Sequence, residues 1–141
     1  ATRLAALLGL DGRGGFYVLC GDWGALAQAL AAIAPVTLLL VSPRADVPGQ
    51  STLRGAANAL PLAPGAARGI AIDRASAALA EAAARVLGAR GRLVAPAHTP
   101  VPPGMALLAR DARHWVGERE PVGTTSAPVM PRRAAPRTAS R

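Results

Sequence analysis

Five consecutive residues, Cys20-Gly21-Asp22-Trp23-Gly24, place glycine, a thiol and a carboxylate directly after a short apolar run. A glycine-containing turn between a strand and a helix lets the backbone approach a bound nucleotide, and a carboxylate at the end of the next strand then holds the ribose hydroxyls. Here the next apolar run ends in Leu-Val-Ser-Pro and carries no acid. The pattern predicts the scaffold of a nucleotide-cofactor site that lacks part of its binding chemistry.

The elements that would position this turn follow from apolar periodicity. Strands are expected at 16–20, 36–41, 69–72 and 92–95, and helices over 1–9, from the turn to about residue 34, and over 76–87. Gly88 is expected to cap the last of these helices and Gly91 to lie in the turn that follows. The runs 105–109 and 113–118 predict a hairpin. Alternating strands and helices indicate an α/β fold with a mostly parallel sheet, helices on both faces and a C-terminal antiparallel hairpin.

Length and composition indicate one domain whose core is built from aliphatic side chains. The chain has 141 residues, of which 51% are hydrophobic and only 3% aromatic. We interpret residues 1–120 as the folded domain. The composition of residues 121–141, which is Pro, Thr, Ser, Ala and Arg without periodicity, is typical of an extended tail that is disordered or ordered by a partner.

The positive charge is unevenly distributed along the chain. The formal net charge is +8, and residues 121–141 contribute half of it, because they hold four arginines and no acid: Arg132, Arg133, Arg137 and Arg141. This asymmetry predicts an acidic partner for the tail. An acidic protein surface, an anionic membrane surface and nucleic acid all fit the charge, although the tail has no aromatic residue for stacking on bases, which makes nucleic acid the weakest of the three.

Other reactive side chains do not form a recognisable constellation. Cys20 is the only cysteine, so an intramolecular disulfide and a thiolate zinc site are excluded, and its place at the end of an apolar strand predicts a buried thiol in a reducing compartment. His98 and His114 have no further ligand at metal spacing, so no metal site is expected. The apolar stretch 25–41 is interrupted and too short for a bilayer, and no transmembrane segment is predicted.

Several segments together resemble class I S-adenosylmethionine-dependent methyltransferases over roughly residues 14–120. The first strand, glycine loop and first helix of that family resemble FYVLCGDWGALAQAL, and its second strand resembles VTLLLVSP. The family's fourth strand, with the turn before it, resembles LRGAANALPLAPGAARGIAI. The fifth strand with its preceding helix resembles LAEAAARVLGARGRLVAP, and the closing hairpin resembles LLARDARHWVGERE. The resemblance implies a Rossmann-like methyltransferase fold.

Departures from the family pattern fall on its cofactor contacts. The family loop is Gly-x-Gly-x-Gly, and the resemblance puts its first two glycines at Cys20 and Asp22, so that Gly21, Asp22 and Gly24 are a remnant loop. The ribose-binding acid falls on Leu40 and the adenine-side acid on Ala56, while the acid of the fourth strand falls on Arg68. Asp22 adds a side chain and a negative charge where backbone should meet the cofactor. Trp23, at the mouth of the site, is a core anchor or fills the ligand space.

These losses favour a non-catalytic methyltransferase-like protein over an enzyme. The leading hypothesis is a structural or accessory subunit without a cofactor, docked through its tail on a larger assembly, and our specific guess is the cytoplasmic face of a bacterial membrane-bound photosynthetic or respiratory complex. One alternative is an active small methyltransferase with a divergent loop, which would bind S-adenosylmethionine. Another is a basic RNA- or ribosome-associated module, whose affinity would fall steeply with salt.

Overall fold

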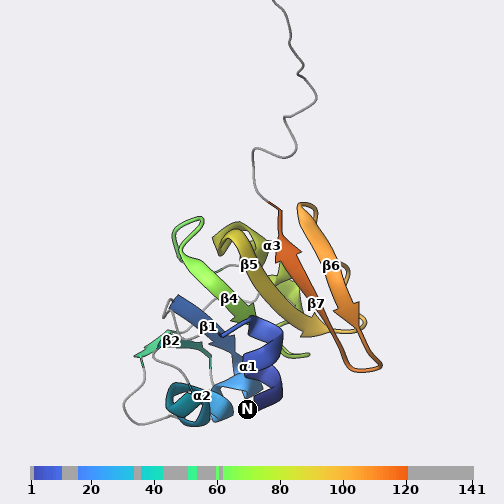
Figure 1. The fold of residues 1–141 in the computed structure, drawn as a ribbon. Helices are drawn as coiled ribbons and strands as arrows, with labels where there is room; N and C mark the ends of the chain where they lie inside the picture. The colour runs from blue at the N-terminus through green and yellow to red at the C-terminus, as the bar shows by residue number, and fades with distance from the viewer. Residues whose placement is uncertain are drawn as a thin grey trace, which may run out of the picture.

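The computed structural model describes residues 2–10, 16–33, 36–42, 51–53, 60 and 62–120. The described strands form one seven-stranded sheet in the order β3-β2-β1-β4-β5-β7-β6 (Figure 1). The strands are β1 (Phe16–Cys20), β2 (Thr37–Val41), β3 (Ser51–Leu53), β4 (Ala67–Ala71), β5 (Leu87–Pro96), β6 (Met105–Arg110) and β7 (His114–Arg119). The helices are α1 (Thr2–Leu8), the 3₁₀ helix η1 (Gly21–Leu26), α2 (Ala27–Ile33), the 3₁₀ turn η2 (Ala77–Leu79) and α3 (Ala80–Val86).

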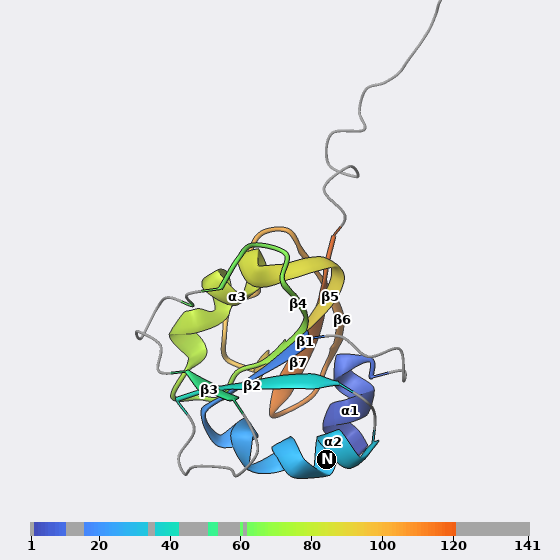
Figure 2. The ribbon, with the colours of Figure 1, turned by 90° about the vertical axis from the view of Figure 1, so that its left-hand side faces the viewer.

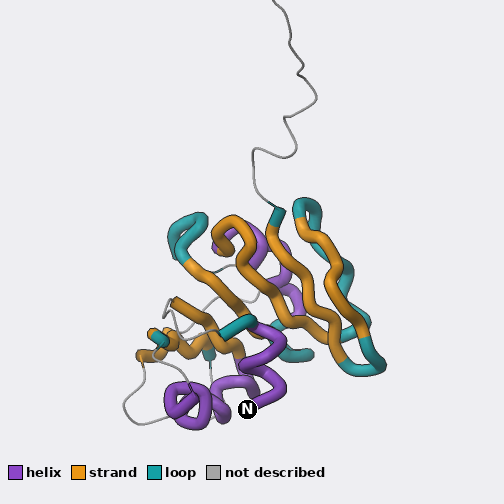
Figure 3. The backbone as a smooth tube through the Cα atoms, viewed as in Figure 1, coloured by secondary structure: helices purple, strands orange, loops and turns teal. Residues whose placement is uncertain are grey.

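The sheet has a parallel part and an antiparallel part. Strands β1 to β5 pair in parallel, and β7 pairs antiparallel with both β5 and β6. The expectation of a mostly parallel sheet that ends in an antiparallel hairpin is therefore confirmed, and the tube view shows that hairpin at one side of the sheet (Figure 3). The short strand β3 is an addition, because the sequence around residues 51–53 predicts only an irregular segment.

Helices cover both faces of the sheet, as its apolar strands predict. One buried cluster joins α3 to side chains such as Val18, Ile70 and Trp115, and the other joins α1 and α2 to side chains such as Leu19 and Leu40. In Figure 2 α3 and α1 lie on opposite sides of the strands. Because α3 is built largely from alanine and several of its alanines are buried, its backbone can approach the sheet closely.

Three local predictions are wrong in detail. The expected turn at residues 21–24 is the start of η1, which leads directly into α2. Gly88 does not cap the helix, because α3 ends at Val86 and the next residue, Leu87, is already extended and begins β5. Gly91 likewise lies within β5 rather than in a turn. The strand extends back to residue 87 because Leu87 pairs with Ala67 of β4. The register shifts before the next pair, Gly69 with Arg92, and Arg90 within this irregular stretch has φ 65°.

Arginine side chains close the ends of two helices. The end of α1 has the hydrogen bonds of a Schellman motif, from Gly9 N–H to the Ala6 carbonyl and from Leu10 N–H to the Ala5 carbonyl, with Gly9 at φ 72°. The guanidinium of Arg92 donates to the carbonyls of α1, and that of Arg119 donates to carbonyls at the end of α3. A cation at a helix C-terminus satisfies orphan carbonyls and the helix dipole together.

None of the helices in the described ranges has the length and apolar character needed to cross a bilayer.

Candidate functional site

A cleft of about 990 Å³ opens where β1, β4 and β5 end, beside the turn between β6 and β7. In open parallel sheets this crevice at the carboxyl ends of the strands is where ligands bind. Its walls carry the titratable side chains Asp22, Asp73, His98, Arg113 and His114 together with the ring of Trp23. The cleft therefore contains carboxylates, imidazoles and guanidinium groups within one concave surface.

Two residues that line the cleft, Asp22 and Asp73, are in contact beside Gly21. The backbone N–H of Asp22 donates a hydrogen bond of 2.7 Å to Oδ2 of Asp73. Gly21 adopts φ 63°, and a Cβ at this position would lie 2.2 Å from the same carboxylate oxygen. Only glycine fits here, because both the left-handed backbone and the approach of the carboxylate exclude a side chain. An internal carboxylate thus accepts an N–H of the turn.

Asp73 is held in this position by a second set of hydrogen bonds. Its Oδ1 accepts the backbone N–H of Ser76 at 2.9 Å and the hydroxyl of Ser76, and its own N–H donates to that hydroxyl oxygen at 2.9 Å. The pair forms a reciprocal turn immediately before η2 and α3. Asp73 is not among the site residues expected from the sequence, although an Asp-x-x-Ser spacing directly after an apolar strand is a signal for this kind of turn.

Trp23 joins three segments at the wall of the cleft. Its Nε1–H donates to the carbonyl of Ile72 at 2.9 Å, and its ring centroid lies 5.2 Å from that of His114 with the planes tilted by 51°. The tilted arrangement is a favourable geometry for two rings. Trp23 is half-buried and lines the cleft without closing it. Its position therefore fits the expected role of an anchor better than that of a residue that fills the ligand space.

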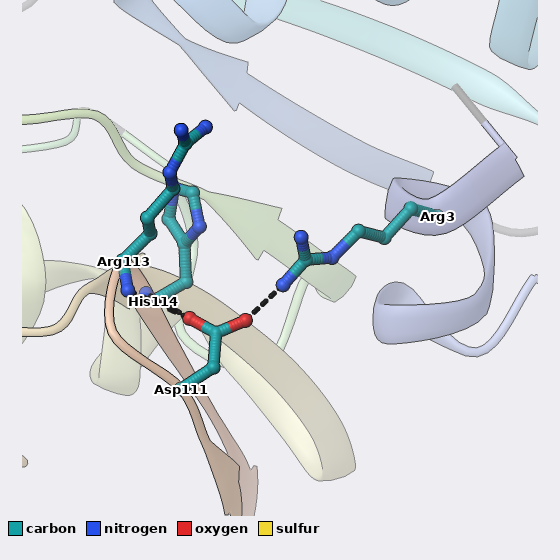
Figure 4. Close-up of polar contacts among 4 residues, drawn as sticks. All are labelled: Arg3, Asp111, Arg113 and His114. Carbon is teal, nitrogen blue, oxygen red and sulfur yellow. Dashed lines mark hydrogen bonds and ion pairs between the residues drawn. The ribbon is translucent and has the colours of Figure 1, made fainter.

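The turn between β6 and β7 is organised by Asp111 (Figure 4). Its Oδ1 accepts the N–H groups of Arg113 and His114 at 2.7 and 2.8 Å, and its Oδ2 forms an ion pair with Arg3 of α1. The hydrogen bond from His114, then that from Arg113, lowers the pKa of Asp111 to about 2, and the charge of Arg3 acts in the same direction. The contact ties α1 to the hairpin across the edge of the cleft.

Partial burial lowers the pKa of His114 below its ordinary value. The charge of Asp111 opposes this shift, while Arg3 and Arg113 add to it. The neutral ring is therefore the favoured form in the fold, and any stability that it provides is present above the ordinary pKa and is lost as the pH falls through the lowered one. A neutral imidazole beside Trp23 can accept or donate a hydrogen bond toward the cleft.

The structure separates the residues that the resemblance assigns to the cofactor. Asp22 lines the cleft, the neighbouring Gly21 does not, and Gly24 is buried within η1. Leu40 is fully buried against Leu19 and the helices α1 and α2, and it lines none of the described recesses. Arg68 is exposed near the start of β4, at the opposite end of the sheet from the cleft. Ala56 and the tail arginines Arg132, Arg133, Arg137 and Arg141 lie outside the described residues.

Cys20 is placed as the sequence predicts, at the end of β1 with its thiol buried. Burial, with a smaller contribution from the charge of Asp73, raises the pKa of this thiol to about 12. We expect a thiol-specific disulfide reagent at neutral pH to leave the native chain unlabelled and to label it fully in 8 M urea, because the thiolate is the reactive form. Labelling of the native chain within seconds would instead show that the thiol of Cys20 is accessible and reactive. The groups of His, Cys, Asp and Glu in the described ranges include none that could hold a metal ion.

Comparison with solved structures places this geometry in a known fold. One similar structure is a chain from the complex between the Haloferax volcanii Trm112 methyltransferase activator and a candidate methyltransferase. It matches with a TM-score of 0.62 and 13% identity, over 84% of this chain and 89% of that one. The antibiotic-resistance methyltransferase Kmr matches with a TM-score of 0.54 and 16% identity, over 84% of this chain and 92% of Kmr.

A third neighbour is geranyl diphosphate C-methyltransferase from Streptomyces coelicolor A3(2), with a TM-score of 0.54 and 16% identity over 67% of this chain. This chain covers only 41% of that enzyme's length. The sequence matches no family model and no curated protein. At these identities the likeness establishes the class I methyltransferase fold, which the sequence resemblance implies, and it does not establish an activity.

Proposed function

We propose that this chain is a methyltransferase-fold protein that does not use S-adenosylmethionine and serves as an accessory subunit of a larger assembly. The observation that carries the proposal is the Asp73 carboxylate, which lies against the Gly21 turn and accepts the N–H of Asp22. A backbone N–H at such a turn is a donor for an anionic or polar ligand group. In this chain an internal carboxylate already accepts it, so this donor is not available to a cofactor.

The residues present do not fit the cofactor that the fold implies. The position that the resemblance assigns to the ribose-binding acid is Leu40, which has no hydrogen-bond acceptor and is fully buried. A cofactor carboxylate placed at the Gly21 turn would also meet the charges of Asp22 and Asp73. A site that loses the groups pairing with substrate hydroxyls loses on the order of 10⁴-fold in discrimination. No catalytic step through S-adenosylmethionine is therefore derived for this chain.

The docking part of the proposal comes from residues 121–141. Four arginines without an acid give this segment a charge that suits carboxylates or phosphates, which guanidinium groups bind in bidentate fashion. Its prolines reduce the conformational entropy that ordering would remove. The assembly that we favour is a bacterial membrane-bound photosynthetic or respiratory complex, with this chain on the cytoplasmic face.

An active small methyltransferase is the second candidate, and the open cleft is the observation that favours it. A decayed site in a protein of this size could fill with side chains, yet about 990 Å³ remains between η1 and the β6–β7 turn. The cleft also contains groups suited to proton transfer, since it is lined by Asp73 and by His114, whose pKa is lowered. An RNA-associated module has no comparable support, because the four Phe, Tyr and Trp rings of the chain are buried or half-buried.

A calorimetric titration of S-adenosylhomocysteine into the folded full chain separates the first two candidates. We expect no heat at protein concentrations that would reveal millimolar binding, with an active class I methyltransferase as the positive control. A micromolar dissociation constant would overturn the non-catalytic proposal in favour of the enzyme.

The docking proposal has its own test in the source cells, by native electrophoresis of the tagged full chain. We expect wild type to migrate in an assembly far larger than 14.2 kDa. A variant with glutamine at positions 132, 133, 137 and 141 should migrate alone, while lysine at the same four positions, which keeps the charge, should retain part of the assembly. A glutamine variant that stays in the assembly would show that docking does not use this segment.

A further inference from the structure

Excess positive charge in the described part of the chain is concentrated at the end of the sheet where the parallel strands begin. We call this end the basic edge and define it by Arg68, Arg85, Arg90, Arg92, Arg119, Glu118 and Glu120. A polar recess of about 250 Å³ brings Arg68, Arg90, Arg92 and Glu118 together. Arg119 reaches the end of α3, and Arg85 belongs here because its carbonyl accepts the N–H of Gly65. The basic edge thus contains five guanidinium groups and two carboxylates.

The opposite end of the sheet is balanced. The charged residues around the cleft and at the start of α3 are Asp22, Asp73, Glu81, Asp111, Arg3, Arg74, Arg110 and Arg113. They comprise four acids and four arginines, so the whole positive excess of the described residues lies at the basic edge. A segregated charge of this kind orients a protein on an anionic surface, because the local potential decides which end approaches.

Two arginines of the basic edge are available for an external partner. Arg92 and Arg119 are engaged with helix carbonyls. The side chains of Arg85 and Arg90, by contrast, are exposed, and neither guanidinium group has a hydrogen bond or an ion pair with a described residue. The last described residue, Glu120, lies at the same edge, where its N–H donates to the Gly104 carbonyl. Residues 121–141, which hold four further arginines, follow Glu120 in the sequence.

An exposed apolar pair lies close to the basic edge on the outermost strand. Leu107 and Leu108 of β6 are 48% and 46% exposed, and with Ile33 they are the exposed large hydrophobic residues of the described chain. Met105, at the start of β6, pairs with Arg119 of the basic edge. The leucines are two and three residues further along the same strand, so about 7–10 Å separates them from that edge at the rise of a strand.

We propose that the basic edge and the Leu107–Leu108 pair form one membrane-binding face, which docks on anionic phospholipid headgroups while the leucines enter the interface. Stable attachment of a peripheral protein takes two signals, and here the arginines supply the electrostatic one and the leucines the apolar one. The inference rests on the proposed function in one respect, because a membrane-binding face would hold this chain beside a membrane-bound assembly. A lipid surface suits the face better than RNA, because no exposed aromatic ring is present among its described residues to stack on bases.

The test is sedimentation of the full chain with vesicles of phosphatidylcholine, with and without 30% phosphatidylglycerol, at 0.1 M salt. We expect binding to the anionic vesicles alone. Each arginine near an anionic surface contributes about fivefold in partitioning, so Arg85→Gln with Arg90→Gln should weaken binding about 25-fold. The matched control is Arg74→Gln with Arg113→Gln, which removes the same charge from the cleft end and should weaken binding less than about threefold. Leu107→Ser with Leu108→Ser should weaken it about tenfold.

Three results would overturn the proposal. They are no binding to the anionic vesicles, an equal loss in the two double arginine variants, and binding of a single-stranded RNA at the same salt that is as tight as binding to vesicles. The titration of S-adenosylhomocysteine into the same preparation is independent of these outcomes. A chain that binds both vesicles and S-adenosylhomocysteine would contradict the non-catalytic function and leave the membrane-binding face intact.

Discussion

Replacement of Gly21 by alanine should destabilise the fold by about 3 kcal/mol, measured by urea unfolding. The left-handed backbone at φ 63° costs an alanine about 1 kcal/mol. The new Cβ would also lie 2.2 Å from Asp73 Oδ2, so the carboxylate must move away. That movement breaks the hydrogen bond to the Asp22 N–H, and a lost bond to a charged group costs about 1.5–3 kcal/mol.

Gly104→Ala is the matched control for the backbone term. Gly104 has φ 84°, and nothing lies within 4 Å of the position that a Cβ would take there, so only the strain of about 1 kcal/mol should be observed. A double-mutant cycle with Asp73→Ala isolates the contact. If Gly21 and Asp73 meet as described, Gly21→Ala should cost clearly less in the Asp73→Ala background than in wild type. Equal costs in both backgrounds would show that the carboxylate does not lie on the turn.

Leu40→Asp should cost about 5 kcal/mol, enough to unfold a domain of ordinary stability. The resemblance places the ribose-binding acid at this position, so the substitution restores the family residue. In the structure, however, Leu40 is fully buried in the cluster that joins β1 and β2 to α1 and α2. The change removes a packed side chain, which costs about 2–5 kcal/mol, and it leaves a carboxyl group without a partner in an apolar site.

Two controls accompany Leu40→Asp in circular dichroism and urea unfolding. Leu40→Met keeps the volume and should cost less than about 1.5 kcal/mol. Leu107→Asp makes the same chemical change at an exposed position and should be nearly neutral. If Leu40→Asp instead folded with little loss and bound S-adenosylhomocysteine, the side chain would face the cleft, and the proposal of a protein that does not use the cofactor would fail.

Local sequence patterns were sufficient for the main elements of the fold. The apolar runs that form β1 and β2 predict buried strands of a parallel sheet, and in the structure Gly9 at the end of α1 has the left-handed backbone of a C-cap. The boundaries of β5 were not predictable in the same way. Its first residues include glycine and arginine, which have low strand preference, and they belong to the strand because Leu87 pairs with Ala67 of β4, although the register shifts before Arg92 and Arg90 has φ 65°.

Some features of the candidate site could likewise be predicted from local sequence, and others could not. The glycine directly after β1, the buried thiol of Cys20 and the lack of an acid at Leu40 could all be predicted, because they depend on residue type and on position within or beside one apolar run. The contact of Asp73 with the turn could not, since Asp22 and Asp73 are 51 residues apart and meet through the pairing of β1 with β4. The location of the charge is a further consequence of folding. Arginines scattered from residue 68 to residue 119 come together at one edge because β4, β5 and β7 are neighbours in the sheet, and no local pattern encodes which strands become neighbours.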